Sequence, residues 1–349
     1  MSKARELAEL GGAYNDAALS NRNVIINGAM QVAQRGTSFA SVGNVYTLDR
    51  FQMYKQNTGA AFTVTQSSVA DLEGFANALK VDCTTADTSL ASNEQGYISY
   101  FAEGRDCQRL KKGHGGDAVP TTLSFYVKTN KTGLYTVSFF DRDNTRKVNG
   151  SYTVANTNWN RYSITFPADA SGKLDDNNAS SLEIFFNLYA GADTNTGTLY
   201  TAWQASADAG STTGQVNFAD STSNDWEITG VQLEVGSEAT PFEHKTFSQE
   251  LHACRRYYSR RYIGNIGIGW CAGASQWNYS PMTLVPEMRA SPTSSYQGGV
   301  SAGTWVTATQ KGVSTNSSEV HTIYHMSSGA ANDIYVSGSD FYIIADAEL

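Results

Sequence analysis

Two pairs of neighbouring carboxylates are the residues in this sequence best placed to do chemistry. Asp141 and Asp143 lie in DRDNT, and Asp175 and Asp176 lie in DASGKLDDNN. Hydrolysis of a glycosidic bond needs two carboxyl groups about 5–9 Å apart in a cleft. Both pairs fall in segments rich in Asp, Asn and Gly, which form local hydrogen bonds in turns. We therefore expect turns and no enzyme activity.

Metal ligation is a second possible use of these polar residues. DRDNT begins like a calcium loop, but it lacks the glycine at position six and the distal glutamate. The histidines are scattered, and the two closest, His321 and His325, lie in a predicted strand. No GxSxG, HExxH or phosphate-binding glycine loop is present. The sequence therefore predicts no metal and no cofactor.

The four cysteines have no zinc-binding spacing, because none belongs to a CxxC pair: Cys83, Cys107, Cys254 and Cys271. The pattern favours buried thiols. A disulfide between Cys83 and Cys107 is the alternative.

Sugar recognition would depend on aromatic faces with a few polar groups beside them. Trp159, just before RYSITF, could be such a platform or could close the edge of a sheet. A better group lies near the C-terminus, among Gly- and Ser-rich loops: Trp270, Trp277, Tyr279 and Trp305. These residues could bind a receptor, or they could fill a core that has little Leu and Ile.

The elements that position these residues are predicted to be strands. Apolar residues alternate with a period of two in TTLSFYVKT, LYTVSFF, RYSITF and LEIFFNL, and the alternation continues through Leu199, Thr201 and Trp203. Asn- and Gly-rich turns separate the runs, and no amphipathic helix lies between them. The pattern from Val24 to Phe242 predicts an antiparallel sandwich or jelly roll of roughly eight to ten strands.

The segment EITGVQLEV changes its alternation at Gly230. Trp226 and Ile228 have one parity, whereas Val231 and Leu233 have the other. One extra residue in a strand shifts the parity, and glycine tolerates the positive φ that this needs. We predict a β-bulge at Gly230–Val231, with a strand buried on both faces as the alternative.

Two helices are predicted. Residues 2–10 form a short amphipathic helix that cannot be stable alone and needs a partner surface, contacted through Leu7 and Leu10. Residues 245–261 follow a capping box formed by Thr246 and Gln249. The second helix has an apolar seam suited to a subunit contact: Phe247, Leu251, Cys254 and Tyr258. Its arginines suit the negative end of a helix dipole.

These elements divide the chain into an N-terminal segment (1–20), a jelly-roll domain (21–244), a connecting helix (245–261) and a C-terminal β domain (262–349). The fold class is therefore all-β. Charged residues make up 17 % of the chain, and the net charge is −8. This balance disfavours nucleic acid and is compatible with neutral glycans. No apolar run is long enough to insert into a membrane, and the charged N-terminus predicts synthesis in the cytoplasm.

Three long motifs resemble a module of tailed bacteriophages, found in tail-fibre and adhesin proteins of phages of marine bacteria and cyanobacteria. They are NRNVIINGAMQVAQRGTSF (21–39), YTLDRFQ (46–52) and EITGVQLEVGSEATPFEHKTFSQELHACRRYY (227–258). The opening SKARELAEL and the closing AEL are also similar to the ends of such fibres. The resemblance spans most of residues 21–262.

The resemblance implies a virion protein, made in the host cytoplasm, that attaches the phage to its host. It implies a jelly roll similar to carbohydrate-binding modules, a homotrimer, an N-terminus bound to a tail or other virion protein, and a C-terminal half that binds a host glycan or protein. Jelly rolls of this kind often hold a structural calcium, but NVIINGAM, the expected first strand, has no carboxylate. A capsid-attached decoration fibre and a polysaccharide depolymerase are the alternatives.

Overall fold

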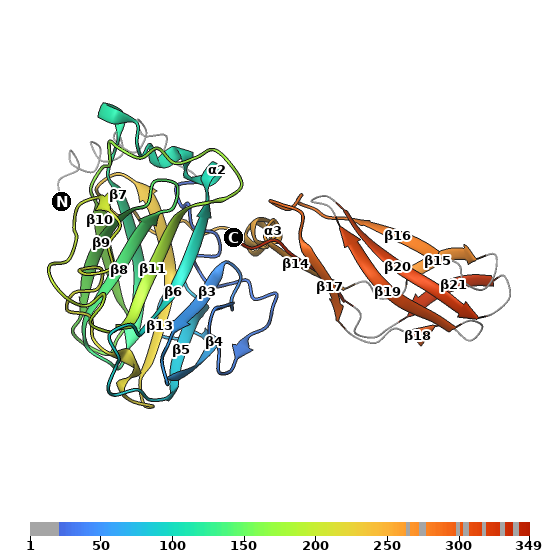
Figure 1. Ribbon diagram of the computed structural model, residues 1–349, viewed down its shortest axis with the longest axis horizontal. Coiled ribbons are helices and arrows are strands. Elements are labelled where there is room, and N and C mark those ends of the chain that lie inside the picture. The colour runs from blue at the N-terminus through green and yellow to red at the C-terminus, as the bar shows by residue number, and fades with distance from the viewer. Residues whose placement is uncertain are drawn as a thin grey trace. The chain divides into compact units, whose positions relative to one another are not determined.

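The computed structural model describes residues 21–262, 266–271, 277–297, 301–302, 307–315, 319–328, 332–337 and 342–349. The chain divides into two compact units, Met1–Phe247 and Ser248–Leu349. The first unit is a β-sandwich (Figure 1). The prediction of an all-β, antiparallel fold is confirmed.

The sandwich has two antiparallel sheets. Sheet A contains, in spatial order, β1 (Ser38–Phe39), β4 (Ala61–Ser68), β5 (Asn77–Thr85), β13 (Asp225–Val235), β7 (Thr121–Thr129) and β10 (Asn160–Phe166). Sheet B contains β12 (Gln204–Ala205), β9 (Arg146–Val154), β8 (Gly133–Asp141), β11 (Ser180–Ala190), β6 (Gln95–Glu103), β3 (Phe51–Gln56) and β2 (Val45–Tyr46). Short helical turns occur at α2 (Gly104–Cys107), η1 (Gln108–Leu110), η2 (Gly115–Asp117) and η3 (Phe218–Asp220).

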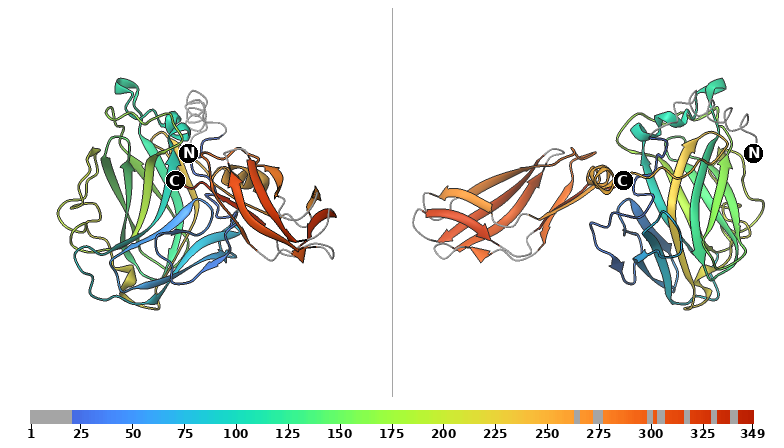
Figure 2. Two further views of the ribbon diagram at one scale, coloured as in Figure 1. Left: turned by 45° about the vertical axis from the view of Figure 1, so that its right-hand side comes forward. Right: turned by 180° about the vertical axis from the view of Figure 1, so that it is seen from behind.

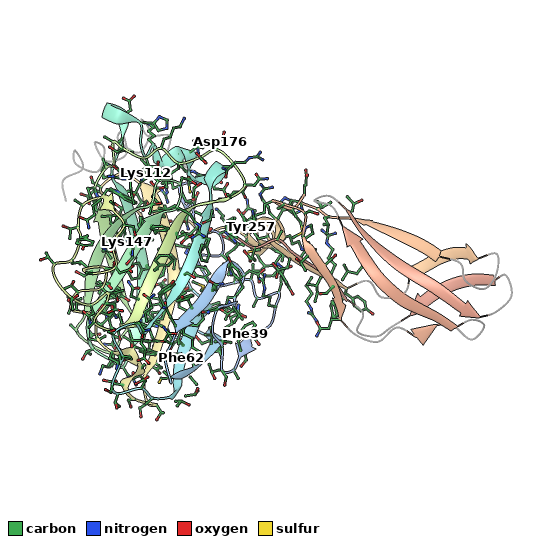
Figure 3. All side chains as sticks on the ribbon, in the orientation of Figure 1. Phe39, Phe62, Lys112, Lys147, Asp176 and Tyr257 are labelled. Carbon is green, nitrogen blue, oxygen red and sulfur yellow. The ribbon has the colours of Figure 1, made fainter. Side chains whose placement is uncertain are left out.

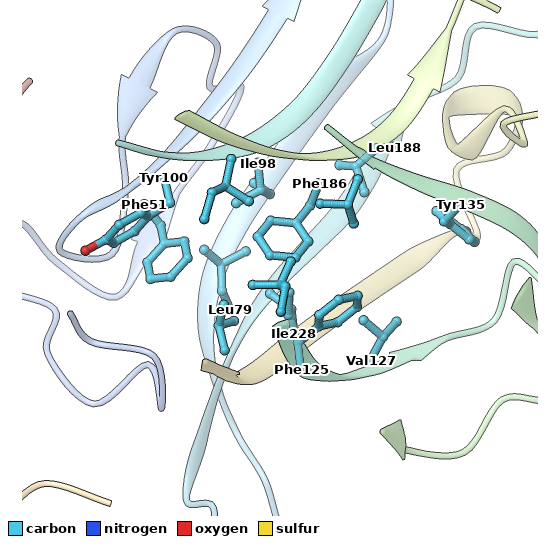
Figure 4. Close-up of a cluster of buried hydrophobic side chains, with 14 of the residues drawn as sticks. Phe51, Leu79, Ile98, Tyr100, Phe125, Val127, Tyr135, Phe186, Leu188 and Ile228 are labelled. Carbon is cyan, nitrogen blue, oxygen red and sulfur yellow. The ribbon is translucent and has the colours of Figure 1, made fainter. Parts of the chain in front are cut away.

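The core lies between the sheets and is built from the alternating residues of the predicted strands. Leu79, Phe125 and Ile228 from sheet A are fully buried with Ile98 and Phe186 from sheet B (Figure 4). The other parity of the same strands is therefore on the outer faces of the sandwich.

The alternation at Leu199, Thr201 and Trp203 predicted a strand, and this prediction is wrong. Residues 199–203 are irregular, and β12 covers Gln204–Ala205. The indole N–H of Trp203 donates to the carbonyl of Pro167 at 3.0 Å, so tertiary contacts outweigh the local pattern.

The β-bulge in β13 is confirmed. Thr229 pairs with Tyr126 and Gln232 pairs with Ser124, so Gly230 and Val231 together oppose one residue of β7. Gly230 has a φ of +62°. After the bulge β13 is also buried on both faces, since Gln232 and Val231 are each inaccessible to solvent. Both interpretations of the sequence are therefore correct for this half of the strand.

We expected NVIINGAM to form the first strand, but the structure has no strand in this segment. Residues 26–29 form a turn, in which the N–H of Met30 donates to the carbonyl of Asn27 at 2.9 Å. Asn27 and Met30 both have positive φ, which interrupts an extended strand.

The second unit begins at Ser248, the second residue of α3 (Phe247–Arg255), and continues as three small antiparallel sheets. Their strand orders are β14 (Tyr258–Tyr262), β22 (Tyr342–Asp346) and β17 (Thr293–Gln297); β15 (Ile266–Cys271), β21 (Asn332–Ser337) and β18 (Ser301–Ala302); and β16 (Trp277–Thr283), β20 (Glu319–Ser328) and β19 (Thr307–Thr315). Figure 2 shows β strands of this unit from two further directions.

The helix predicted for 245–261 is shorter than expected. It begins directly after Thr246, where the capping box places it, but it ends at Arg255. Tyr258 is buried in β14, where it pairs with Asp346 of β22. Tyr257 and Tyr258 favour a strand that can bury them, and this burial ends the helix.

Candidate functional site

The outer face of sheet B is the candidate functional site. On β6 the residues that alternate with the core are Tyr97, Ser99 and Phe101, and on β11 they are Glu183, Phe185 and Asn187. Aromatic side chains on the outer parity of a strand are not needed for the core. Such aromatic side chains are expected either to be covered by another segment of the chain or to contact a ligand.

Six partly exposed aromatic residues of this face form the aromatic strip: Tyr46, Tyr54, Tyr97, Phe101, Phe140 and Phe185. The rings of Tyr54 and Tyr97 stack with their centroids 4.6 Å apart and their planes at 12°. The centroids of Tyr97 and Phe185 are also 4.6 Å apart. Strand pairing fixes this order, since Tyr54 of β3 lies opposite Tyr97 of β6.

Polar groups lie between the rings. Ser99 is placed between Gln52 and Phe185 by the register of β3, β6 and β11. Glu183 lies between Phe101 and Phe140 in the same way. Its carboxylate is buried and pairs with the exposed guanidinium of Arg142 at 3.0 Å, and burial raises the pKa of Glu183.

The loop from 191 to 217 covers the other half of sheet B. The side-chain oxygen of Gln215 accepts from the N–H of Thr136 at 2.7 Å, and its amide donates to the carbonyl of Asn187 at 3.1 Å. The carbonyl of Tyr200 accepts from the N–H of Asn149 at 2.7 Å. The loop thus forms a wall beside the aromatic strip.

A polar pocket of about 140 Å³ lies between this loop and the β6 end of the strip. Its lining is Gln56, Ser92, Asn93, Glu94, Gln95, Asp193, Thr194 and Asp208. The backbone N–H of Asp193 donates to the carbonyl of Ser92 at 2.8 Å, which ties its two loops together. The pocket meets the strip at Gln56, which accepts from the hydroxyl of Tyr54 at 3.1 Å.

The sequence did not single out the aromatic strip, although it contained a signal for it. In YISYF and EIFFN, large aromatic residues occupy both parities, so Phe185 follows Ile184 and precedes the core residue Phe186. A half-buried strand needs large apolar residues on one parity alone. The surplus of aromatic residues on the second parity marks the strip.

The predicted receptor-binding residues are placed differently. Trp270 lies in β15, and Trp277 and Tyr279 lie in β16 of another sheet. Their side chains and Trp305 lie outside the described residues, so this site stays a prediction. Leu7 and Leu10 also lie outside the described residues.

Two of the predicted seam residues differ sharply in exposure. Phe247 is 55 % exposed on α3, and Cys254 is fully buried. The helical seam therefore ends at Cys254, with Leu251 partly exposed, and does not include Tyr258. The subunit contact itself stays a prediction.

Asp141, Asp143 and Asp175 of the two carboxylate pairs have structural partners. Asp141 is buried and contacts the ammonium of Lys112, which also lies 3.0 Å from Asp169. Asp143 accepts from the N–H of Asp175 at 2.9 Å. The ammonium of Lys112 thus provides the counter-charge for Asp141, the first residue of DRDNT. Figure 3 shows Lys112 and Asp176 at the same end of the sandwich.

The remaining candidates are also structural. Cys83 and Cys107 are buried and do not form a disulfide. The indole N–H of Trp159 donates to Asp71 at 2.9 Å, consistent with its role at the edge of the sandwich. Within the described residues, no cluster of three or more His, Cys, Asp or Glu could hold a metal, and no helix is long and apolar enough to cross a membrane.

The motifs that resemble phage fibres contact one another. Asn27 of the first motif donates to the carbonyl of Asp49 in YTLDRFQ at 3.0 Å. The carboxylate of Asp49 in turn accepts from the N–H of Gln34 at 2.7 Å. Asn27 and Asp49 are fully buried, so they hold the fold and do not contact a receptor.

Comparison with solved structures found a phage tailspike domain and carbohydrate-binding modules, each at low similarity. One neighbour is the enzymatically active domain of bacteriophage CBA120 tailspike protein 4, with a TM-score of 0.32 and 12 % identity over 61 % of this chain and 21 % of that one. The present chain thus spans about a fifth of that tailspike structure.

Two further neighbours are carbohydrate-binding modules. The CBM22-1 xylan-binding domain from Paenibacillus barcinonensis has a TM-score of 0.28 and 13 % identity over 58 % of this chain and 94 % of that one. TmCBM61, solved with β-1,4-galactotriose, has a TM-score of 0.31 and 8 % identity over 62 % of this chain and 99 % of that one. No family model matches the chain, and the search of curated proteins gave no match.

Proposed function

We propose that this chain is a glycan-binding adhesin of a bacteriophage virion, with the aromatic strip on sheet B as a glycan-binding surface. The observation that carries the proposal is the run of partly exposed rings from Tyr54 through Tyr97 to Phe185, with centroid spacings of 4.6 Å. A buried sheet face would not leave such rings accessible. A surface that takes up apolar groups beside hydroxyls needs both rings and polar neighbours.

A sugar has the matching chemistry, because its C–H faces are apolar and its edges carry hydroxyl groups. The rings of the strip would contact the C–H faces. The partly exposed side chain of Gln52, which the buried hydroxyl of Ser99 contacts at 3.4 Å, would exchange hydrogen bonds with sugar hydroxyls. Along β6 the strip extends about 13 Å from Tyr97 to Phe101, enough for more than one sugar ring.

The polar pocket favours an uncharged glycan. Its lining contains Glu94, Asp193 and Asp208 and no lysine or arginine. These carboxylates accept hydrogen bonds from sugar hydroxyls but repel carboxylate or sulfate groups. The net charge of −8 acts in the same direction at longer range.

The virion role rests on the resemblance of residues 21–262 to phage fibres. In that role the N-terminal segment binds a tail protein through Leu7 and Leu10, and three chains associate through the seam on α3. A second contact with the host is formed by the predicted receptor-binding residues Trp270, Trp277, Tyr279 and Trp305. Immunogold labelling of virions separates this role from a capsid-attached decoration fibre: gold on the tail supports it, and gold on the capsid contradicts it.

Glycan binding is tested by calorimetric titration of the full chain with neutral oligosaccharides, beginning with xylohexaose and β-1,4-galactotriose and continuing with neutral polysaccharides of candidate hosts. Tyr97→Ala and Phe185→Ala should each weaken binding by about tenfold, since a stacked ring contributes about 0.5–1.5 kcal/mol beyond its buried area. The control is Tyr262→Ala, which removes a ring that is 56 % exposed in the second unit. Binding that is unchanged by both strip variants would contradict the proposal.

A further inference from the structure

The two ends of the jelly roll are joined by a set of contacts that we call the clasp, formed by residues 21–23 and 240–244. The backbone N–H groups of Asn21 and Asn23 donate to the two carboxylate oxygens of Glu243, at 2.5 and 2.9 Å. The guanidinium of Arg22 donates to the carbonyl of Pro241 at 3.1 Å. One carboxylate thus holds the segment that enters the domain against the segment that leaves it.

The clasp is fixed to the half of β13 that follows the bulge. The side-chain oxygen of Asn23 accepts from the N–H of Leu233 at 3.0 Å. Gln232 accepts from the N–H of Glu243 at 2.8 Å, and Glu234 accepts from the N–H of Thr240 at 3.0 Å. The side chains of Gln232 and Glu234 are buried, so the clasp is part of the folded domain.

The register of β13 shows on which face the leaving segment lies. Val231 and Leu233 belong to the core, so Gln232 and Glu234 point to the outer face of sheet A. Other outer-face residues of sheet A contact the same segment: Thr122 donates to the carbonyl of Gly236 at 2.8 Å. The chain therefore leaves over sheet A, whereas the aromatic strip lies on the outer face of sheet B.

We propose that the clasp stays closed in the assembled protein and carries the load between the two ends of the jelly roll. Tension between these two ends acts on the clasp and not on the sandwich core. The outer face of sheet B is left without a covalent attachment and is free to bind a large polysaccharide. This last consequence rests on the proposed function, whereas the clasp itself does not.

Energy transfer between two dyes tests the closed clasp in the full chain. Donor and acceptor are attached at Asn21→Cys and His244→Cys, both exposed positions, and dye-treated wild-type chain corrects for native cysteines. The matched pair is Asn21→Cys with Thr222→Cys, because Thr222 precedes the far end of β13, which lies about 26 Å along the strand from the clasp contact at Leu233. With a short-range dye pair, whose Förster distance is below the 21/222 separation, we expect transfer several-fold higher for 21/244 than for 21/222, before and after assembly. Transfer at 21/244 that falls to the 21/222 value on assembly would overturn the proposal.

Two variants and a capture assay complete the test. Glu243→Ala should lower the 21/244 transfer, and Glu238→Ala, in the same segment and exposed, should not. Equal transfer in both variants would show that Glu243 does not hold the clasp. The chain can also be captured on streptavidin through biotin at His244→Cys, and its glycan affinity should then stay within twofold of that of the free chain. Capture through biotin at Ser151→Cys, on the outer face of β9, should reduce the glycan affinity about tenfold. High transfer without any glycan binding would reject the proposed function and leave the clasp standing.

Discussion

The backbone N–H of Val231 donates a hydrogen bond of 2.9 Å to the carbonyl oxygen of Gly28. This bond joins two motifs that are distant in the sequence. It exists because the bulge at Gly230 ends the pairing of β13 with β5 at Ile228 and leaves the next N–H without a strand partner. The segment that contains Gly28 takes the place of β5. A Cβ atom on Gly28 would lie 2.2 Å from the carbonyl oxygen of Val231, so this approach requires glycine.

Replacement of Gly230 by alanine should destabilise the sandwich by about 2–4 kcal/mol. The added Cβ would lie 2.8 Å from the rings of Phe75 and Tyr126, and the φ of +62° is unfavourable for alanine. Urea-induced unfolding of the full chain measures the change. Gly116→Ala is the control, because no atom lies within 4 Å of its added Cβ. A loss below about 0.5 kcal/mol at Gly230 would mean that the bulge can relax.

Replacement of Lys112 by methionine should destabilise the fold by about 3–5 kcal/mol at pH 7, because Asp141 and Asp169 would lose their buried cation. Burial acts to raise the pKa of Asp169, but hydrogen bonds from Arg146 and Lys112 outweigh burial and lower it. The stabilisation from Asp169 is therefore complete above its unfolded pKa of about 3.9 and is lost as the pH falls through the lower folded value.

Thermal melting of the Lys112 variant and of wild type should consequently converge as the pH falls below about 4. Lys173→Met removes an exposed lysine from the same end of the sandwich and should change the melting temperature little. A difference between wild type and the Lys112 variant that is constant from pH 7 to pH 3 would contradict an electrostatic role.

Phe185 and Phe186 are neighbours in the sequence, but their replacement by alanine should affect different properties. The change at Phe186 should mainly reduce stability, and the change at Phe185 should mainly reduce glycan binding. Phe186 is fully buried in the core, so its replacement should reduce the free energy of unfolding by about 3–5 kcal/mol. Phe185 is partly exposed on the strip, so its replacement should change stability by about 1 kcal/mol or less and reduce glycan binding. Chemical denaturation and titration together check both, and a large stability loss at Phe185 would assign it to the core.

The acidic pocket should control discrimination between neutral and anionic sugars. The double variant Asp193→Asn, Asp208→Asn should raise binding of a uronic-acid oligosaccharide by about threefold to tenfold at low salt, because it removes two exposed carboxylates from the lining. Asp176→Asn has the same chemistry in another loop and should have no effect. If both variants bind the acidic sugar equally, the pocket does not set the charge preference.

The seam on α3 should control assembly if three chains associate. Sedimentation of the wild type is expected to give a trimer. Phe247→Asp should give monomers of unchanged fold, because a charge would replace an apolar side chain that is 55 % exposed in the single chain. Ser248→Asp, next to it and also exposed, should remain trimeric. A wild-type monomer would refute the trimer.

The sequence by itself determined the strands and the bulge. Period-two alternation in TTLSFYVKT and LEIFFNL reports which parity enters the core, and the change of parity at Gly230 required an extra residue. These features are local, because the backbone geometry of a strand fixes them within a few residues. The end of α3 at Arg255 could not be predicted from the local sequence, because it depends on the burial of Tyr258 against β22.

The tertiary structure decided the candidate site and the clasp. Tyr54, Tyr97 and Phe185 come from three strands, and strand register alone brings their rings together. Glu243 meets Asn23 because the bulge releases the edge of β13, a consequence that depends on how the sheets assemble. Alternation can assign a residue to the outer face of a strand, but which outer-face residues become neighbours depends on strand order, and strand order is a property of the whole fold.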